Sequence, residues 1–320
     1  MSQPSFVVAI AGVSGAGKTT LVRRVAELLG DAAALHFDDY RPVANYPHYP
    51  AEMPQWIEAG RDLDAWEIPQ LLDDLKALRG GQAITLPDHK DEVRPARFIV
   101  LEEPAGRERT GMGDVIDFVV WLDLPLEIAL ARKVVEAFDY WLHHIPPAEL
   151  AQAVQRGVDY FSPYPLARAY YLTLIERVKP NCDLILDGTR ATDALAQEIV
   201  AAVETNARNR ALLIQTYAAF NARDVEAILA VMHPEVDWPN GMEGGRVYGH
   251  QGVRDYWRRQ WALIDPRVEP RGFGIEADGR IGVDVQQVVR NLEGQVLSDR
   301  QVRHVYLIRD GLIMSMEIRG

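Results

Sequence analysis

The 320-residue chain is long enough for about two domains, and its hydrophobic fraction of 48% is that of an ordinary globular protein. The formal net charge of −12 argues against non-specific nucleic-acid binding, and no apolar stretch is long enough to cross a membrane. Because Cys182 is the single cysteine and the N-terminus lacks the basic start of a signal peptide, we expect no disulfide and a cytoplasmic location.

The first expected element is a buried strand over residues 6–11, which leads into a glycine-rich turn and an amphipathic helix. The turn, residues 12–19, reads G-V-S-G-A-G-K-T and matches the phosphate-binding pattern G-x-x-x-x-G-K-[ST]. Glycines let such a turn wrap an anion, while its N–H groups and the helix N-terminus point at the phosphates. The candidate nucleotide-binding residues are Gly12, Ser14, Gly15, Ala16, Gly17, Lys18, Thr19 and Thr20.

Two side chains of this turn are expected to act directly on bound ATP. Lys18 would reach the β- and γ-phosphates and take part in catalysis. The hydroxyl of Thr19 would bind Mg²⁺.

Acidic side chains follow the next two strands, at Asp38-Asp39 and at Glu102-Glu103. Ligands bind beyond the carboxyl ends of strands in an open α/β sheet, so these acids are expected near the phosphate-binding turn. An acid of the first pair can accept a proton from a substrate hydroxyl; an ordinary acidic turn is the alternative. An acid of the second pair can orient the water shell of Mg²⁺, with capping of the following turn as the alternative. We assign the metal role to Glu103, although the sequence does not decide between Glu102 and Glu103.

The remaining segments of the first half complete a layered pattern. Residues 41–65, rich in Pro, Tyr and Trp, are not expected to form a regular helix; they form either a substrate-binding flap or a surface loop. Pro125 opens a helix that carries Arg132 and Lys133, and we expect Lys133 to face solvent. Strands that alternate with helices predict an α/β fold with a doubly wound parallel sheet. The five expected strands are residues 6–11, 33–37, 98–101, 117–123 and 183–187.

Five segments of this half carry a family resemblance: GVSGAGKTT (12–20), HFDDYRP (36–42), LEEPAGRER (101–109), IALARK (128–133) and LILDGTR (184–190). Through them the first half resembles the uridine kinase-like branch of the P-loop kinases, which includes nicotinamide riboside and pantothenate kinases. The resemblance implies an enzyme that uses ATP and Mg²⁺ to phosphorylate a hydroxyl of a nucleoside-like or vitamin-like molecule. It also implies that Asp38 is the general base and that Arg132 is the arginine of the lid.

The second half differs in composition from the first, which indicates a second domain. After Thr205 there are 15 Arg, no Lys and 15 acidic residues, so all of the excess negative charge precedes it. We therefore expect a P-loop kinase domain over residues 1–205 and a separate domain over residues 206–320. Helices followed by strands in hairpin order predict an α+β fold. The expected helices are 211–220, 225–232 and 250–264, and the expected strands are 236–239, 268–277, 280–291, 296–309 and 312–318.

Four segments carry a second resemblance: YAAFNARD (217–224), HPEVDW (233–238), YGHQGVRDYW (248–257) and VYLIRDG (305–311). Through them residues 210–320 resemble the SnoaL-like, or nuclear transport factor two-like, fold, an α+β cone that hosts enzymes, binding proteins and dimerisation modules. The resemblance implies a homodimer held through this domain. Candidate cavity residues are Trp238, Tyr256, Trp257, Trp261, Asp237, Asp299, Arg303 and Glu317. For each aromatic, packing in the core is the favoured alternative, and Asp237 and Arg303 are the first to test.

These patterns favour an ATP- and Mg²⁺-dependent small-molecule kinase fused to a SnoaL-like ligand-binding or dimerisation module. No nucleic-acid or membrane partner is expected. Two alternatives stay open. The first domain is a nucleotide-binding regulatory switch without an acceptor, or the cone carries the chemistry as a cyclase, hydratase or isomerase.

Overall fold

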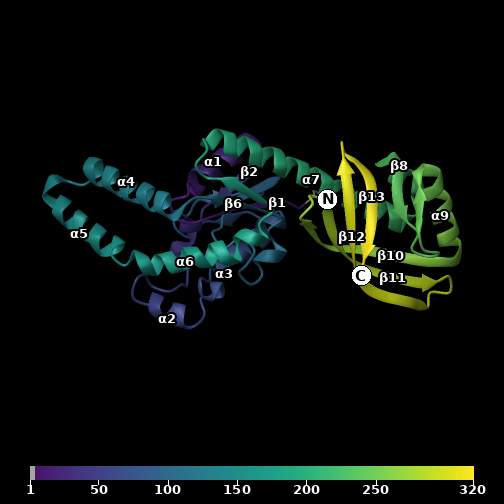
Figure 1. The fold of residues 1–320 in the computed structure, drawn as a ribbon, viewed down its shortest axis with the longest axis horizontal. Helices are drawn as coiled ribbons and strands as arrows, with labels where there is room; N and C mark the ends of the chain where they lie inside the picture. Colours follow the sequence, from purple (N-terminus) through teal and green to yellow (C-terminus); the bar gives the residue numbers. More distant parts are fainter. Residues whose placement is uncertain (1–3) are drawn as a thin grey trace. The chain divides into compact units, whose positions relative to one another are not determined.

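A computed structural model describes residues 4–320 and divides the chain into two compact units, the first ending at Val203 and the second beginning at Glu204 (Figure 1). No helix within these described residues is long and apolar enough to span a membrane. Each unit has its own sheet, so the two are described separately.

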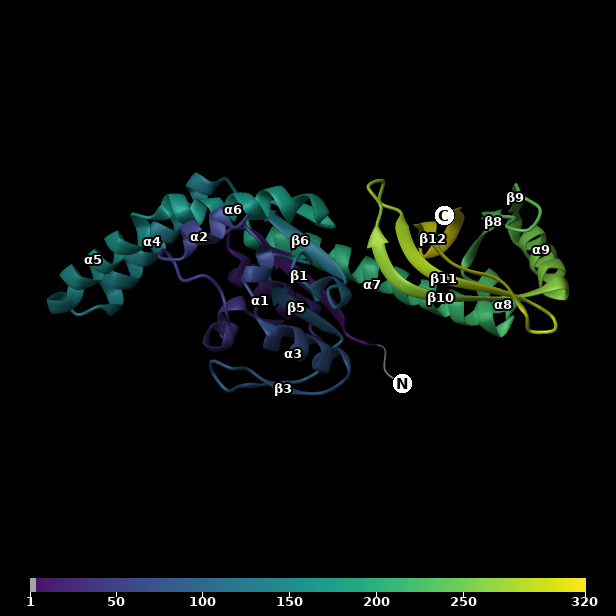
Figure 2. The ribbon, with the colours of Figure 1, turned by 90° about the horizontal axis from the view of Figure 1, so that it is seen from below.

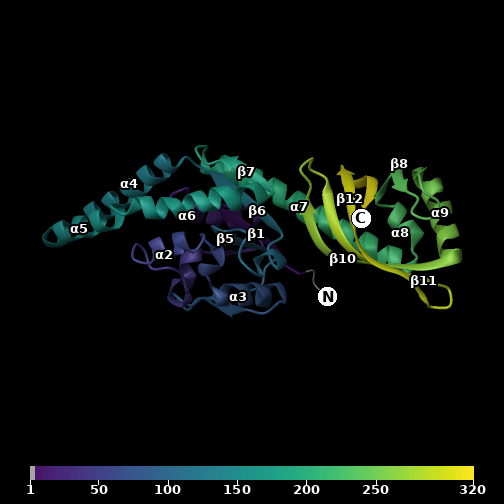
Figure 3. The same ribbon diagram turned by 60° about the horizontal axis from the view of Figure 1, so that its bottom comes forward.

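The first unit is built on a five-stranded parallel sheet of order β2-β5-β1-β6-β7, with helices around it (Figure 3). The expected parallel α/β sheet is therefore confirmed. All six residues of β1 are buried, as continuous apolar runs in a parallel sheet require. The strands are β1 (Phe6–Ala11), β2 (Ala32–Leu35), β5 (Phe98–Glu102), β6 (Phe118–Asp123) and β7 (Leu184–Asp187).

Helices and short 3₁₀ turns connect these strands. The segment 41–65 contains one regular helix that the sequence did not predict, because Pro54 lies in its first turn, where a missing N–H costs nothing. Residues 84–93 form a short hairpin of β3 (Ile84–Thr85) and β4 (Glu92–Val93). The helices are α1 (Lys18–Leu29), α2 (Met53–Glu58), α3 (Pro69–Arg79), α4 (Leu126–His144), α5 (Leu150–Phe161) and α6 (Tyr164–Arg177).

Helix α7 (Thr192–Ala222) runs without interruption through the point where one unit ends and the other begins. The sequence left open whether the polar stretch 205–210 continues as helix between its neighbours. That stretch contains neither Gly nor Pro, and nothing else within residues 192–222 breaks a helix, so the helix continues.

The second unit is an α+β domain with a curved six-stranded sheet of order β10-β11-β12-β13-β8-β9 (Figure 2). All neighbours pair antiparallel except β13 and β8, which pair parallel. The expected cone is thus confirmed, although β9 was too short to predict. Its elements are α8 (Val225–Leu229), α9 (Gly249–Leu263), β8 (Met232–Pro239), β9 (Arg246–Tyr248), β10 (Ile264–Ile275), β11 (Ile281–Asn291), β12 (Val296–Arg309) and β13 (Leu312–Arg319).

Candidate functional site

The glycine-rich turn between β1 and α1 forms a backbone cradle. Gly12, Gly15 and Gly17 have φ values of +144°, +83° and +98°, which favour glycine over residues with a Cβ. A Cβ on Gly15 would lie 2.4 Å from the carbonyl oxygen of Ala129 in α4, so no larger residue fits there. Thr20 follows in the first turn of α1. Such a tight glycine turn before a helix has the backbone conformation that phosphate-binding turns use.

Lys18 is a buried cation at the base of this cradle. Its Nζ donates to the carbonyl oxygen of Val13 at 3.2 Å and lies 3.6 Å from Oε1 of Glu102. Burial lowers the pKa of Lys18, and Glu102 only partly opposes this effect, while the charge of Lys133 adds to it. A phosphate in the cradle would supply the additional negative charge that favours the ammonium form.

Thr19 and Glu102 form a second polar pair beside Lys18. The Thr19 hydroxyl donates to Oε2 of Glu102 at 2.8 Å, and Nδ1 of His36 lies 3.6 Å from the same oxygen. Burial disfavours the Glu102 carboxylate, but His36, Lys18 and Thr19 outweigh burial and lower its pKa to about 2. Glu102 is therefore an ionised carboxylate next to a hydroxyl. Proteins usually bind Mg²⁺ through one or two carboxylates together with the phosphates of the substrate.

The choice of Glu103 as the metal residue needs correction. Its side chain is fully buried, forms an ion pair with Arg109 and accepts the N–H of Ala105 at 3.0 Å. Successive side chains of a strand point to opposite faces, so only one acid of the pair can face the turn. That acid is Glu102, which lies opposite Ile10 of β1; this register was not readable from the sequence.

The second acidic pair also divides between two roles. Asp39 accepts the N–H of His36 at 3.1 Å and so caps the 3₁₀ turn that follows β2. Asp38 is exposed, and its charge raises the pKa of Lys18, although burial of Lys18 has the larger, opposite effect. Of the two acids, Asp38 is therefore the one available to a substrate.

Helix α4 lies against the cradle through its two basic residues. Arg132 donates to the carbonyl oxygen of Ala16 at 3.4 Å and to that of Gly188 at 3.3 Å. The side chain of Lys133 passes close to Gly15, where a Cβ would meet its Cγ at 3.1 Å, and Nζ pairs with Glu136 at 3.2 Å. Lys133, which we expected only to face solvent, is thus also a cation beside the cradle.

Aromatic side chains gather next to Asp38, since the ring of the adjacent Phe37 stacks on that of Tyr46 at 6.3 Å. Tyr46 stacks on Trp66 at a ring distance of 5.3 Å, and Trp66 lies 4.2 Å from Tyr170 of α6. The aromatics of segment 41–65 are therefore packed together rather than splayed over the surface. Sequence reasoning missed Tyr170, because nothing in residues 134–160 indicated that α6 returns to this position.

Arg107 and Arg109 of the segment LEEPAGRER have partners inside the first unit. Arg107 pairs with Asp183 at 2.7 Å, and Arg109 pairs with Glu103 and donates to the carbonyl oxygen of Trp66 at 2.6 Å. Both guanidinium groups therefore tie loops of the first unit together.

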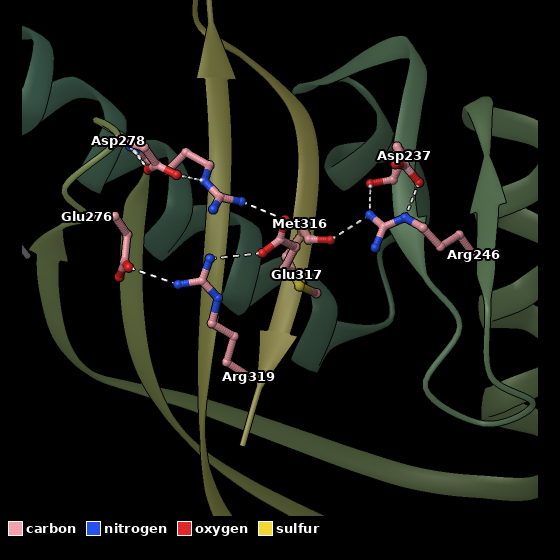
Figure 4. Close-up of polar contacts among 8 residues, drawn as sticks. Asp237, Arg246, Glu276, Asp278, Met316, Glu317 and Arg319 are labelled. Atoms are coloured by element: carbon pink, nitrogen blue, oxygen red, sulfur yellow. Dashed lines mark hydrogen bonds and ion pairs between the residues drawn. The ribbon is translucent and has the colours of Figure 1, made fainter.

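The second unit has a partly open cavity of about 360 Å³. Trp238, Tyr256 and Trp257 belong to the hydrophobic core and also line this cavity. The expected polar residues are engaged elsewhere. Asp237 pairs with Arg246, and Glu317 pairs with Arg319 at 3.1 Å (Figure 4).

Arg303 pairs with Glu276 at 2.8 Å and with Asp284 at 2.6 Å, and Asp299 accepts a hydrogen bond from Gln286. The prediction that Asp237 and Arg303 line the cavity is therefore wrong. The same prediction is wrong for Asp299, Glu317 and Trp261, which are not among the lining residues either. Along a strand the two faces alternate, and Arg303 precedes a residue, His304, that does line the cavity.

Acid should destabilise the second unit through His304. This side chain is only 4% exposed, and burial lowers its pKa from 6.5 to about 4. Between these two pH values His304 binds a proton more readily in the unfolded chain than in the folded one. The contribution of neutral His304 to the free energy of unfolding is therefore complete above pH 6.5 and is lost as pH falls through 4. A shift of this size corresponds to about 3 kcal/mol. Denaturant unfolding followed by tryptophan fluorescence at several pH values measures this effect. The free energy of unfolding should fall less steeply with decreasing pH in His304→Phe than in the wild type. Equal slopes in the two proteins would contradict the assignment to His304.

The N-terminal region is homologous to uridine kinases and phosphoribulokinases. It is 29% identical over 147 residues to the uridine kinase of Halobacterium salinarum, covering 42% of this chain and 63% of that protein. It is 26% identical over 141 residues to the phosphoribulokinase of Synechocystis, covering 40% of each. The uridine kinase of Borrelia duttonii is 23% identical over 192 residues, 85% of its length. The chain thus spans less than two thirds of the first two relatives.

Residues 213–316 match the family model of the SnoaL-like domain. Similar solved structures include TerC co-crystallised with polyporic acid, 32% identical over 35% of this chain and 89% of that one, with a TM-score of 0.32. Another is an NTF2-like protein of unknown function from Burkholderia pseudomallei, 29% identical with the same coverage and TM-score. The chain therefore joins a unit related to uridine kinases and phosphoribulokinases to a SnoaL-like domain.

Proposed function

We propose that the first unit is a kinase that transfers the γ-phosphoryl group of ATP to a hydroxyl of a small, nucleoside-like or vitamin-like molecule. The observation that supports this most strongly is the buried Lys18 in a glycine cradle, with the ionised Glu102 on the Thr19 hydroxyl beside it. Bound Mg²⁺–ATP would supply the transferable phosphoryl group and the metal that neutralises its charge. The relatedness to uridine kinases and phosphoribulokinases supports the same class of reaction.

Each residue of the site has a proposed task. Lys18 holds the β- and γ-phosphates, and Thr19 with Glu102 holds the metal. Asp38 accepts the proton of the attacking hydroxyl, while Arg132 offsets negative charge on the group in transfer. The packed aromatics around Trp66 lie on the Asp38 side and favour an acceptor with a ring.

Acceptor-dependent release of ADP tests this proposal directly. The full chain is incubated with Mg²⁺–ATP and with panels of nucleosides, vitamins and sugars, and each panel is repeated with Lys18→Ala as the blank. We expect at least one acceptor to raise ADP release above the blank. ADP release that no acceptor increases would favour the regulatory switch, and no ADP release from the wild type would remove both.

A matched pair of variants separates the two neighbouring glutamates. Glu102→Gln is expected to raise the Mg²⁺ concentration for half-maximal activity by about tenfold, because it removes a charged ligand. Glu103→Gln should leave the Mg²⁺ dependence unchanged but destabilise the unit by roughly 3 kcal/mol, because it leaves the charge of Arg109 buried without its partner. Mg²⁺ titrations and thermal melts of both variants measure this. The opposite pattern would return the metal role to Glu103.

We also propose a cytoplasmic homodimer held through residues 210–320. Truncation after Ala207 should then give a monomer that still binds ATP, because the whole candidate site lies before that residue. The cut falls inside α7, so some loss of stability is expected. Light scattering on the full and truncated chains measures the mass of each. A truncated chain that remains dimeric would contradict an interface in the second unit.

A further inference from the structure

Two consecutive tyrosines of α6 contact different parts of the candidate site. Neighbouring side chains of a helix lie about 100° apart, so each meets its own surroundings. The Tyr170 ring lies 4.2 Å from that of Trp66, in the aromatic cluster next to Asp38. The Tyr171 hydroxyl lies within hydrogen-bonding reach of the Ser14 side chain in the glycine-rich turn. This part of α6 therefore joins the Asp38 side of the site to the phosphate cradle.

Ser14 lies at the end of the cradle where the γ-phosphate is expected. Nζ of Lys18, the group that would hold the β- and γ-phosphates, donates to the carbonyl oxygen of Val13, the residue before Ser14, at 3.2 Å. The charge of Asp38, the proposed base, acts on the same ammonium group. In phosphoryl transfer the γ-phosphate must lie between the groups that hold it and the base that activates its acceptor. Tyr171 borders this space from α6.

Tyr171 is half-buried among other tyrosines, which hold its ring in place. Its ring lies 6.4 Å from that of Tyr164, whose hydroxyl donates to the carbonyl oxygen of Leu126 in α4 at 3.5 Å. Tyr49 and Tyr160, which are joined by a hydrogen bond of 2.9 Å, lie near its hydroxyl. Burial raises the pKa of Tyr171, so the phenol keeps its proton at neutral pH. Such a hydroxyl serves as a hydrogen-bond donor rather than as a base.

We propose that Tyr171 donates a hydrogen bond to the γ-phosphate of bound ATP and so distinguishes ATP from ADP. In the structure its hydroxyl faces the Ser14 side chain, which is a neutral partner. A phosphate oxygen is a charged acceptor and forms a stronger hydrogen bond than a neutral one. ADP lacks this acceptor, so the product should dissociate more readily than ATP. The assignment rests on the proposed binding of ATP in the cradle.

Nucleotide binding to the full chain tests this role without any acceptor present. ADP and AMP-PNP, a non-hydrolysable analogue of ATP, are titrated with Mg²⁺ against a fluorescent derivative of ADP, and its displacement gives each Kd. Tyr171→Phe keeps the ring and removes the donor. It should raise the Kd for AMP-PNP by about tenfold and leave the Kd for ADP within about twofold of the wild type.

Tyr164→Phe is the matched control for this substitution. It removes a hydroxyl from the same helix and the same group of rings, but that hydroxyl donates to Leu126. The ratio of the two dissociation constants should therefore equal that of the wild type. Thermal melts check that both variants are folded.

Two results would overturn the role of Tyr171 and leave the kinase proposal intact. Equal weakening of ADP and AMP-PNP binding in Tyr171→Phe would mean that the hydroxyl supports the turn rather than the γ-phosphate. Unchanged binding of both nucleotides, with or without a change in the KM of the acceptor, would mean that it does not contact the γ-phosphate. Failure of the wild type to bind either nucleotide would remove this proposal together with the kinase proposal.

Discussion

Replacing Lys18 by alanine is expected to lower phosphoryl transfer by about 10³-fold or more and to weaken ATP binding. The ammonium group is buried at the base of the cradle, where burial lowers its pKa and the nearby charges of Glu102 and Asp38 oppose this effect only in part. A contact between this cation and the transferring phosphate is stronger in such a dry position than at the surface. Its loss therefore removes a stabilising interaction that water cannot replace.

The fold should survive this substitution, which makes the loss interpretable. Burial of the Lys18 ammonium is itself unfavourable, and Glu102 keeps Thr19 and His36 as partners, so the melting temperature should stay within about 5 °C of the wild type. Arg23→Ala removes a positive charge from an exposed position of the same helix and should leave turnover unchanged. Steady-state kinetics with the acceptor found by the ADP assay measure both variants. Wild-type turnover in Lys18→Ala would remove the kinase proposal.

The cradle could be predicted from the sequence because its residues are contiguous. Strand, glycines, lysine and threonine occupy residues 6–19, and local sterics fix the conformation: Gly15 has a positive φ and no room for a Cβ. The parallel sheet was predictable for a related reason. Continuous apolar strands alternate with helices, and few topologies accommodate that pattern.

The parts of the site that were missed depend on contacts between distant residues. The choice between Glu102 and Glu103 required the pairing of β5 with β1, which sets the face on which each carboxylate lies. Tyr170 of α6 contacts Trp66 although more than a hundred residues separate the two in the sequence. No local pattern contains either relationship.

In the cone, the fold was predictable but the cavity wall was only partly so. Aromatic residues such as Trp257 were predicted correctly because large rings of a small domain are buried together. The charged candidates failed because Asp237 and Arg303 satisfy their charges in ion pairs outside the cavity. His304 and Gln260, which line the cavity, had no distinguishing sequence signal.

Asp38→Asn is expected to lower kcat by on the order of 10²–10⁴ and to leave the KM for ATP nearly unchanged. Asn keeps the size and hydrogen-bonding capacity of the residue but cannot accept the proton of the attacking hydroxyl. Asp38 is exposed and close enough to influence Lys18, so a bound acceptor can reach both groups. The substitution should therefore affect the chemical step rather than nucleotide binding.

Asp39→Asn is the matched control, because it makes the same chemical change one residue away. Its carboxylate accepts the N–H of His36 at 3.1 Å, a bond that the amide oxygen of Asn can also accept. We therefore expect less than a tenfold loss of kcat together with a small decrease in melting temperature. Comparing kcat and KM for both substrates separates the two variants. If Asp39→Asn caused the larger loss of kcat, Asp39 would be the base and Asp38 a surface acid; if neither variant lost activity, proton removal by this acidic pair would not contribute to the rate.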